Sequence, residues 1–211
     1  FKSLDSQSLA GLYEFMTQAT RKLKVSDKIV NAVANSRIVE TETHYVSSSG
    51  ADILQSFLLL ANNFSATAKE GSLTQTRTLN GSVARCLQMG LEAWDFAELL
   101  ASCERTGAQA LELLSAENCP SDTRDLLLAP DQMLIQIHES IGHPLELDRI
   151  LGDERNYAGW SFVKPEDFGK LRYGSKLMNV TFDPTVPGEF ASYSFDDAGT
   201  PATREFLIKD G

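Results

Sequence analysis

Two histidines separated by five positions, with a proline directly after the second, constrain the local fold more than any other feature of this chain. They lie in the segment HESIGHPLELD, residues 138–148. At 3.6 residues per turn, His138 and His143 point about 140° apart on a regular α-helix. The two imidazoles can therefore face one another only if the backbone departs from α-helical geometry between them.

The residues around the second histidine favour such a departure. Gly142 relaxes the backbone just before His143, and Pro144 removes an N–H group and disfavours α-helical angles at the preceding residue. A widened turn of π type would end the helix near residues 141–144 and would bring positions i and i+5 together. We therefore expect both rings on one side of a cleft, and we expect Gly142→Ala to disturb them.

The chemistry of this segment leaves two interpretations open. In the common H-E-x-x-H arrangement, two histidines of one helix share a zinc ion and the adjacent glutamate acts on the bound water. Glu139 directly follows His138, so the same roles can be assigned here. A histidine pair beside a glutamate is also common on an ordinary helix surface. Ile135, Ile137 and Ile141 make the segment apolar, and histidines buried among them would need partners.

Hydrophobic periodicity predicts helices and antiparallel strands in the first part of the chain. Apolar residues recur at helical spacing in 4–24 and again in 91–116. Residues 27–36 suit a helix end or a connector. Residues 37–79 are rich in Thr, Val, Ile, Phe and Tyr and are interrupted at SSSGAD and KEGS. This pattern predicts two or three antiparallel strands joined by tight turns.

A polar stretch with a proline, ENCPSDT at 117–123, indicates a boundary. We predict an α+β fold of antiparallel sheets with packed helices, with an N-terminal α+β domain over 1–118. A strand-rich second domain over 119–211 would carry the histidine helix near its start. RDLLLAP, residues 124–130, predicts a short buried strand, and Pro130 then suits the first residue of a helix.

Composition argues against several classes of function. The formal net charge of −10 disfavours non-specific binding to nucleic acid or to an anionic membrane. The apolar runs FLLLA and MLIQI are far shorter than the about 20 residues of a membrane span. Three cysteines in 211 residues fit a reducing, cytoplasmic compartment better than a disulfide scaffold. Because the sequence starts at Phe1 and stops just after a strand-like run, we expect a piece of a longer protein.

Two motifs, in this order, resemble the TldD/PmbA family, also called modulator of DNA gyrase proteins. HESIGHPLELD is similar to the family's H-E-x-x-x-H helix followed by E-x-D. FDDAGTPATREFLIKDG is similar to its D-D-x-G-T-P segment followed by an apolar strand that closes on D-G. The order of elements upstream is also similar, so the resemblance covers most of the chain. The matching residues are His138, Glu139, His143, Glu146, Asp148, Asp196, Asp197, Gly199, Thr200 and Pro201.

The resemblance implies a zinc metallopeptidase with one Zn²⁺ per catalytic subunit. It assigns metal binding to His138 and His143 and the role of general base to Glu139. It also implies a third ligand, a cysteine in the carboxy-terminal half. Because all three cysteines precede the helix, we expect that ligand outside this chain, and we expect the chain alone to be inactive. Glu146 is the alternative ligand within the chain, but we interpret it as a group that orients a histidine.

The resemblance further implies peptides or unfolded polypeptide segments as substrates, and a homodimer or a heterodimer with another family member. The family includes subunits without the H-E-x-x-x-H residues, so the residues retained here indicate a catalytic-type subunit. Two alternatives stay open. The first is a non-catalytic peptide-binding subunit, which would hold no metal. The second is a regulator that acts on DNA gyrase as a protein, which would bind gyrase in a pull-down and cleave no peptide.

Overall fold

The computed structural model describes residues 9–80 and 85–211, and the chain divides into two compact units. The first unit comprises Phe1–Cys119 and Pro184–Thr203, and the second comprises Pro120–Asp183 and Arg204–Gly211. Residues 184–203 therefore belong with the first unit, although the sequence predicts a second domain that includes them.

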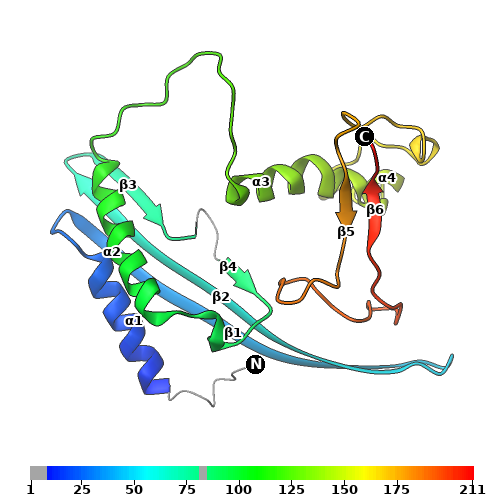
Figure 1. The fold of residues 1–211 in the computed structure, drawn as a ribbon, viewed down its shortest axis with the longest axis horizontal. Coiled ribbons are helices and arrows are strands. Elements are labelled where there is room, and N and C mark those ends of the chain that lie inside the picture. The colour runs from blue at the N-terminus through cyan, green and yellow to red at the C-terminus, as the bar shows by residue number, and fades with distance from the viewer. Residues whose placement is uncertain (1–8, 81–84) are drawn as a thin grey trace. The chain divides into compact units, whose positions relative to one another are not determined.

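A long antiparallel hairpin, β1 (Ile29–Val46) and β2 (Asp52–Glu70), forms the sheet of the first unit (Figure 1). β3 (Leu73–Thr78) and the short β4 (Arg85–Leu87) pair with β2 at separate positions. The predicted antiparallel strands and their two turns are confirmed. The prediction of a helix end or connector over 27–36 is wrong, because its β-branched residues begin a strand that stays in register with β2.

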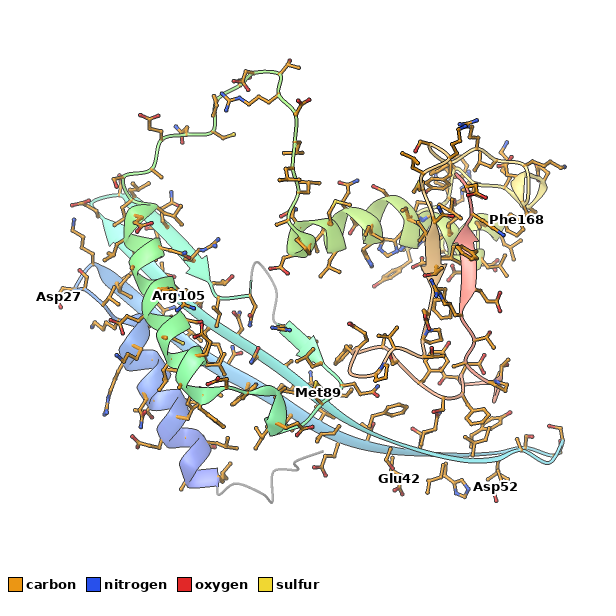
Figure 2. The ribbon with its side chains drawn as sticks, viewed as in Figure 1. Asp27, Glu42, Asp52, Met89, Arg105 and Phe168 are labelled. Atoms are coloured by element: carbon orange, nitrogen blue, oxygen red, sulfur yellow. The ribbon has the colours of Figure 1, made fainter. Side chains whose placement is uncertain are left out.

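Two helices, α1 (Leu9–Leu23) and α2 (Phe96–Glu112), lie side by side on one face of this sheet (Figure 1). Both were predicted, and Leu4 of the first prediction lies outside the described residues. A short 3-10 turn, η2 (Leu91–Ala93), precedes α2. α2 begins after Asp95, whose side chain accepts a hydrogen bond from the Glu98 N–H. Arg105 lies on its exposed side (Figure 2) and pairs with Glu98 at 2.6 Å.

An aromatic cluster fills the space between the helices and the sheet. The Phe15 ring lies 4.8 Å from Phe96, 5.6 Å from Trp94 and 6.4 Å from Phe64, measured between ring centroids. Phe15, Trp94 and Phe64 are buried. Burying each such ring contributes about 1.5–3 kcal/mol, so the cluster holds α1 and α2 on the sheet.

Cys103 lies in this core, and its thiol is expected to be inert in the folded protein. It is fully buried, and burial raises the pKa of its thiol to about 11, whereas Cys86 and Cys119 are exposed. At pH 8 the thiolate that reacts with disulfide reagents is therefore scarce at Cys103. We expect Ellman's reagent to titrate two thiols rapidly and a third after denaturation. In Cys103→Ser the late thiol should vanish; three rapid thiols in the folded parent would contradict this assignment.

Residues 184–203 attach to the first unit through hydrogen bonds between their main chain and two glutamine side chains, Gln55 on β2 and Gln88 directly after β4. The Gln55 amide donates to the Phe195 carbonyl at 2.9 Å and accepts from the N–H groups of Ser194 and Phe195 at 3.1 and 2.9 Å. The Gln88 amide donates to the Ser192 carbonyl at 2.6 Å. These side chains satisfy main-chain groups as a neighbouring strand would, which explains why a segment remote in sequence joins this unit.

The second unit contains short elements joined by irregular chain. These are α3 (Pro130–Ile137), η3 (His138–Gly142), η4 (His143–Leu145), α4 (Leu147–Leu151), η5 (Pro165–Asp167) and the antiparallel strands β5 (Val180–Phe182) and β6 (Glu205–Ile208). The start of a helix at Pro130 is confirmed. The α+β class is confirmed as well, although the described part of this unit has less strand than expected. No helix among the described residues is long and apolar enough to cross a membrane.

The prediction of a buried strand at 124–130 is wrong. No strand forms there, and the side chains of Leu126 and Leu127 are 79% and 97% exposed. A run of leucines carries no alternation that would distinguish a strand, and no neighbouring strand satisfies its main-chain groups.

Candidate metal centre

The helix that carries the two histidines widens between them. α3 ends at Ile137, and residues His138–Gly142 form a π-helical turn. The N–H of His143 donates to the carbonyl of His138, five residues earlier. This hydrogen bond joins the two histidines directly and places position i+5 above position i. The predicted departure from α-helical geometry is therefore confirmed.

Pro144, and not Gly142, accounts for the widening. Gly142 has φ −55° and ψ −66°, which any residue adopts in a helix, and an added Cβ would lie 3.9 Å from its nearest neighbour, His138 Nδ1. The structure therefore removes the reason for expecting Gly142→Ala to disturb the site, because no unusual backbone angle is present there. Pro144 has no N–H to donate to the Ser140 carbonyl four residues earlier, and the Tyr173 hydroxyl donates to that carbonyl instead.

The π turn brings three side chains together. The imidazole centroids of His138 and His143 are 4.1 Å apart, and their planes are inclined by 72°. The Glu139 carboxylate lies 3.8 Å from His138 Nε2 and 4.0 Å from His143 Nε2. One ligand atom from each residue lies within 4.8 Å of the others. The predicted convergence of the two histidines is confirmed, and Glu139 lies beside both.

This group fits a metal ion such as zinc. Zinc binds imidazole nitrogen and carboxylate oxygen at about 2.0–2.2 Å, so atoms that share one tetrahedral ion lie about 3.4 Å apart. The observed separations between ligand atoms, all within 4.8 Å, are somewhat longer than this value. They suit Glu139 either as a ligand or as a base that contacts a water molecule on the ion.

The group is more exposed than the sequence predicts. The side chains of His138, Glu139 and His143 are 56%, 63% and 27% exposed. Ile141 is buried, whereas Ile135 and Ile137 are more than 40% exposed. The apolar character of this segment therefore does not bury its histidines, and convergence of the side chains is the stronger sign of a site.

Glu146 contacts the Nδ1 side of the His143 ring. Its Oε1 lies 2.9 Å from His143 Nδ1, and its Oε2 accepts from Arg149 Nε. The hydrogen bond from His143, with a smaller effect of Arg149, holds the pKa of the Glu146 carboxyl below its usual range. The ionised Glu146 carboxylate can only accept a hydrogen bond, so a neutral His143 ring must carry its proton on Nδ1. The lone pair on His143 Nε2 is then available to a metal. Sequence reasoning found Glu146 but missed Arg149, which follows it by one helical turn.

The other candidate residues lie elsewhere. Asp148 accepts a hydrogen bond from the Arg149 N–H at 2.7 Å and is not part of the histidine group. The third histidine, His44, lies on β1 and pairs with Asp52 at 2.6 Å. All three cysteines lie in the first unit, and no cysteine or histidine follows His143 in the sequence.

The second motif forms a tight turn in the first unit. Asp196 Oδ1 accepts from the N–H groups of Thr200 and Ala198 at 2.7 and 2.9 Å, and these bonds hold the pKa of that carboxyl below its usual range. An added Cβ at Gly199, where φ is +82°, would lie 2.8 Å from the Tyr45 ring. The motif residues thus shape a turn that packs against the end of the hairpin.

Known proteins are similar to this chain in sequence. Residues 121–211 match the family model described as PmbA/TldA metallopeptidase C-terminal domain. A metalloprotease of Methanothermobacter thermautotrophicus is 30% identical over 187 residues, which are 88% of this chain and 38% of that protein. A metalloprotease of Methanocaldococcus jannaschii is 28% identical over 159 residues, 66% of this chain and 34% of that protein.

A crystal structure of a proposed modulator of a DNA gyrase from Thermotoga maritima has a similar fold. Its TM-score is 0.67 at 15% identity, over all of this chain and 45% of that one. The chain spans 34–41% of the length of three of the curated relatives it matches. The segment matched by the family model contains both the histidine group and the Asp196 turn. The chain thus belongs to the PmbA/TldD family, and residues 121–211 carry that family's metallopeptidase C-terminal domain.

Proposed function

We propose that the chain supplies the metal site of a zinc-dependent peptidase that hydrolyses peptides or unfolded polypeptide segments. The observation that carries the proposal is the π turn, which aims His138 and His143 at one point and sets Glu139 beside both. His138 and His143 would hold the ion through Nε2, and Glu146 would orient His143 through Nδ1.

Glu139 is the general base in this mechanism. A bound zinc ion would supply Lewis-acid polarisation of the scissile carbonyl and lower the pKa of the attacking water. The Glu139 carboxylate takes the proton from that water and delivers it to the leaving amine, so no net proton is consumed. The exposure of this carboxylate gives a substrate access to it.

The third ligand and the complete enzyme are expected to involve residues beyond this chain. Two imidazoles and a carboxylate that acts as base leave a tetrahedral zinc short of a protein ligand. A cysteine from another part of the protein would complete the set, as the family resemblance implies. A dimer with a second family member, in a cytoplasmic setting, is part of the same proposal.

Zinc binding by the chain itself tests the ligand assignment. We expect weak Zn²⁺ binding, observed as shifts of the imidazole signals in an NMR titration, and we expect its loss in His138→Ala and in His143→Ala. His44→Ala is the matched control, because this histidine pairs with Asp52 in the first unit and should leave the titration unchanged. Equal binding by all three variants would contradict the assignment.

Assays of a full-length protein that contains this chain separate the alternatives. Zinc content together with cleavage of unfolded peptides supports the peptidase. Peptide binding with neither zinc nor cleavage would indicate a non-catalytic subunit. Binding of DNA gyrase in a pull-down, with no cleavage of peptides, would indicate the regulatory function.

A further inference from the structure

Arg149 and Glu146 connect the main-chain carbonyl of Ala158 to the His143 ring through three successive hydrogen bonds. Arg149 NH1 donates to the Ala158 carbonyl at 2.7 Å, and Arg149 Nε donates to Glu146 Oε2. Glu146 Oε1 lies 2.9 Å from His143 Nδ1. The Arg149 side chain is 16% exposed, so this guanidinium is largely removed from water with both partners in place. Arg149 is the one cation that contacts Glu146 among the described residues.

The segment that follows Ala158 is hydrogen-bonded to the turn that carries Glu146 and Arg149. Ser161 N–H donates to the Arg149 carbonyl at 3.2 Å, and Ser161 Oγ donates to the Pro144 carbonyl at 2.5 Å. Ser161 Oγ also accepts from the Val163 N–H at 2.9 Å. Ser161 therefore forms a hydrogen bond at each end of the turn from Pro144 to Arg149.

We propose that Arg149 is a positioning residue that fixes the Glu146 carboxylate and thereby the ring of His143. The inference rests on the proposed metal site and adds a residue to it. Arg149 lies two hydrogen bonds from His143 Nδ1, the ring nitrogen opposite the proposed ligand atom Nε2, so it acts on the ion only through Glu146 and His143. Its contribution is to hold the Glu146 carboxylate where Oε1 reaches His143 Nδ1.

The shape of the guanidinium suits this task. Its planar fork presents Nε to Glu146 and NH1 to Ala158 at the same time. A lysine offers a single ammonium on a flexible stem and cannot reproduce the fork. Without the cation, Glu146, whose side chain is 41% exposed, is free to turn toward water. The His143 ring then loses its fixed orientation.

Imidazole NMR of the 211-residue chain, labelled with ¹⁵N-histidine, tests the proposal without any metal. Because the chain has three histidines, each ring can be assigned by substitution. The wild type should show the hydrogen-bonded Nδ1–H of His143. Glu146→Gln and Arg149→Gln should weaken or abolish this signal, and Arg149→Lys should retain it in part. Arg155→Gln is the matched control, because the Arg155 guanidinium lies over the Trp160 ring, 4.4 Å from its centroid.

A Zn²⁺ titration of the same variants gives the second measurement. Loss of a group that orients a histidine ligand lowers metal affinity by about 10–100-fold, so we expect about a 10-fold loss in Arg149→Gln and a smaller one in Arg149→Lys. An unchanged His143 signal in both Arg149 variants overturns the inference. If the signal responds but the wild type binds no zinc, the positioning role stands and the proposed metal site fails. If Arg149→Gln does not fold, the His143 signal of Arg149→Lys alone tests the positioning role.

Discussion

Glu139→Gln, introduced into a full-length protein that contains this chain, is expected to lower kcat by about 10²–10⁴-fold. The zinc content should stay unchanged. The carboxylate lies 3.8 and 4.0 Å from the two Nε2 atoms, which suits contact with a water molecule on an ion that these two nitrogens would hold. An amide retains the shape of the side chain and can still orient that water, but it cannot accept its proton.

Parallel measurement of turnover and zinc content decides the role of Glu139. Glu166→Gln, an exposed carboxylate on η5 in the same unit, is the matched control and should change neither quantity. If Glu139→Gln releases the zinc, Glu139 is a ligand and the base must be sought elsewhere. If turnover survives with zinc bound, the proposed proton transfer is wrong.

The geometry of the site was predictable because it depends on local sequence. The five-residue spacing requires a widened turn if the rings are to meet, and Pro144 withholds the hydrogen bond that a regular helix needs there. Gly142 looked equally important, but its helical backbone angles show that its freedom is not used. Arg149 was missed because its partner, the Ala158 carbonyl, lies in irregular chain that no periodicity describes.

The fold was predictable where a pattern repeats along one element. The periodicity of α1 and α2 and the turns of the β1–β2 hairpin were found for that reason. Residues 184–203 could not be placed, because their attachment depends on Gln55 and Gln88, far away in sequence. The start of β1 at Ile29 was missed for a related reason: its partner, Ala68, lies far along the sequence, near the end of β2.

Gly107→Ala is expected to destabilise the first unit by about 1–3 kcal/mol, despite the higher helix propensity of alanine. Gly107 lies on α2, and a Cβ there would lie 2.3 Å from the Leu23 carbonyl oxygen and 3.1 Å from Val25 Cγ1. The nearest obstacle is main chain at the end of α1, so no side chain can rotate away. The two helices would have to separate, which opens the core around the buried Leu23.

Gly142→Ala is the matched control, because it adds the same methyl group in a helical conformation where the nearest atom is 3.9 Å away. The unfolding of each unit can be followed separately, because Trp94 lies in the first unit and Trp160 in the second. Urea denaturation of the first unit, observed through Trp94 fluorescence in a Trp160→Phe background, should show a lower midpoint for Gly107→Ala than for its parent. Denaturation of the second unit, observed through Trp160 fluorescence in a Trp94→Phe background, should show no lower midpoint for Gly142→Ala. Equal midpoints for Gly107→Ala and its parent would mean that α1 and α2 approach less closely in solution. The close helix contact would then not be what requires a glycine at position 107.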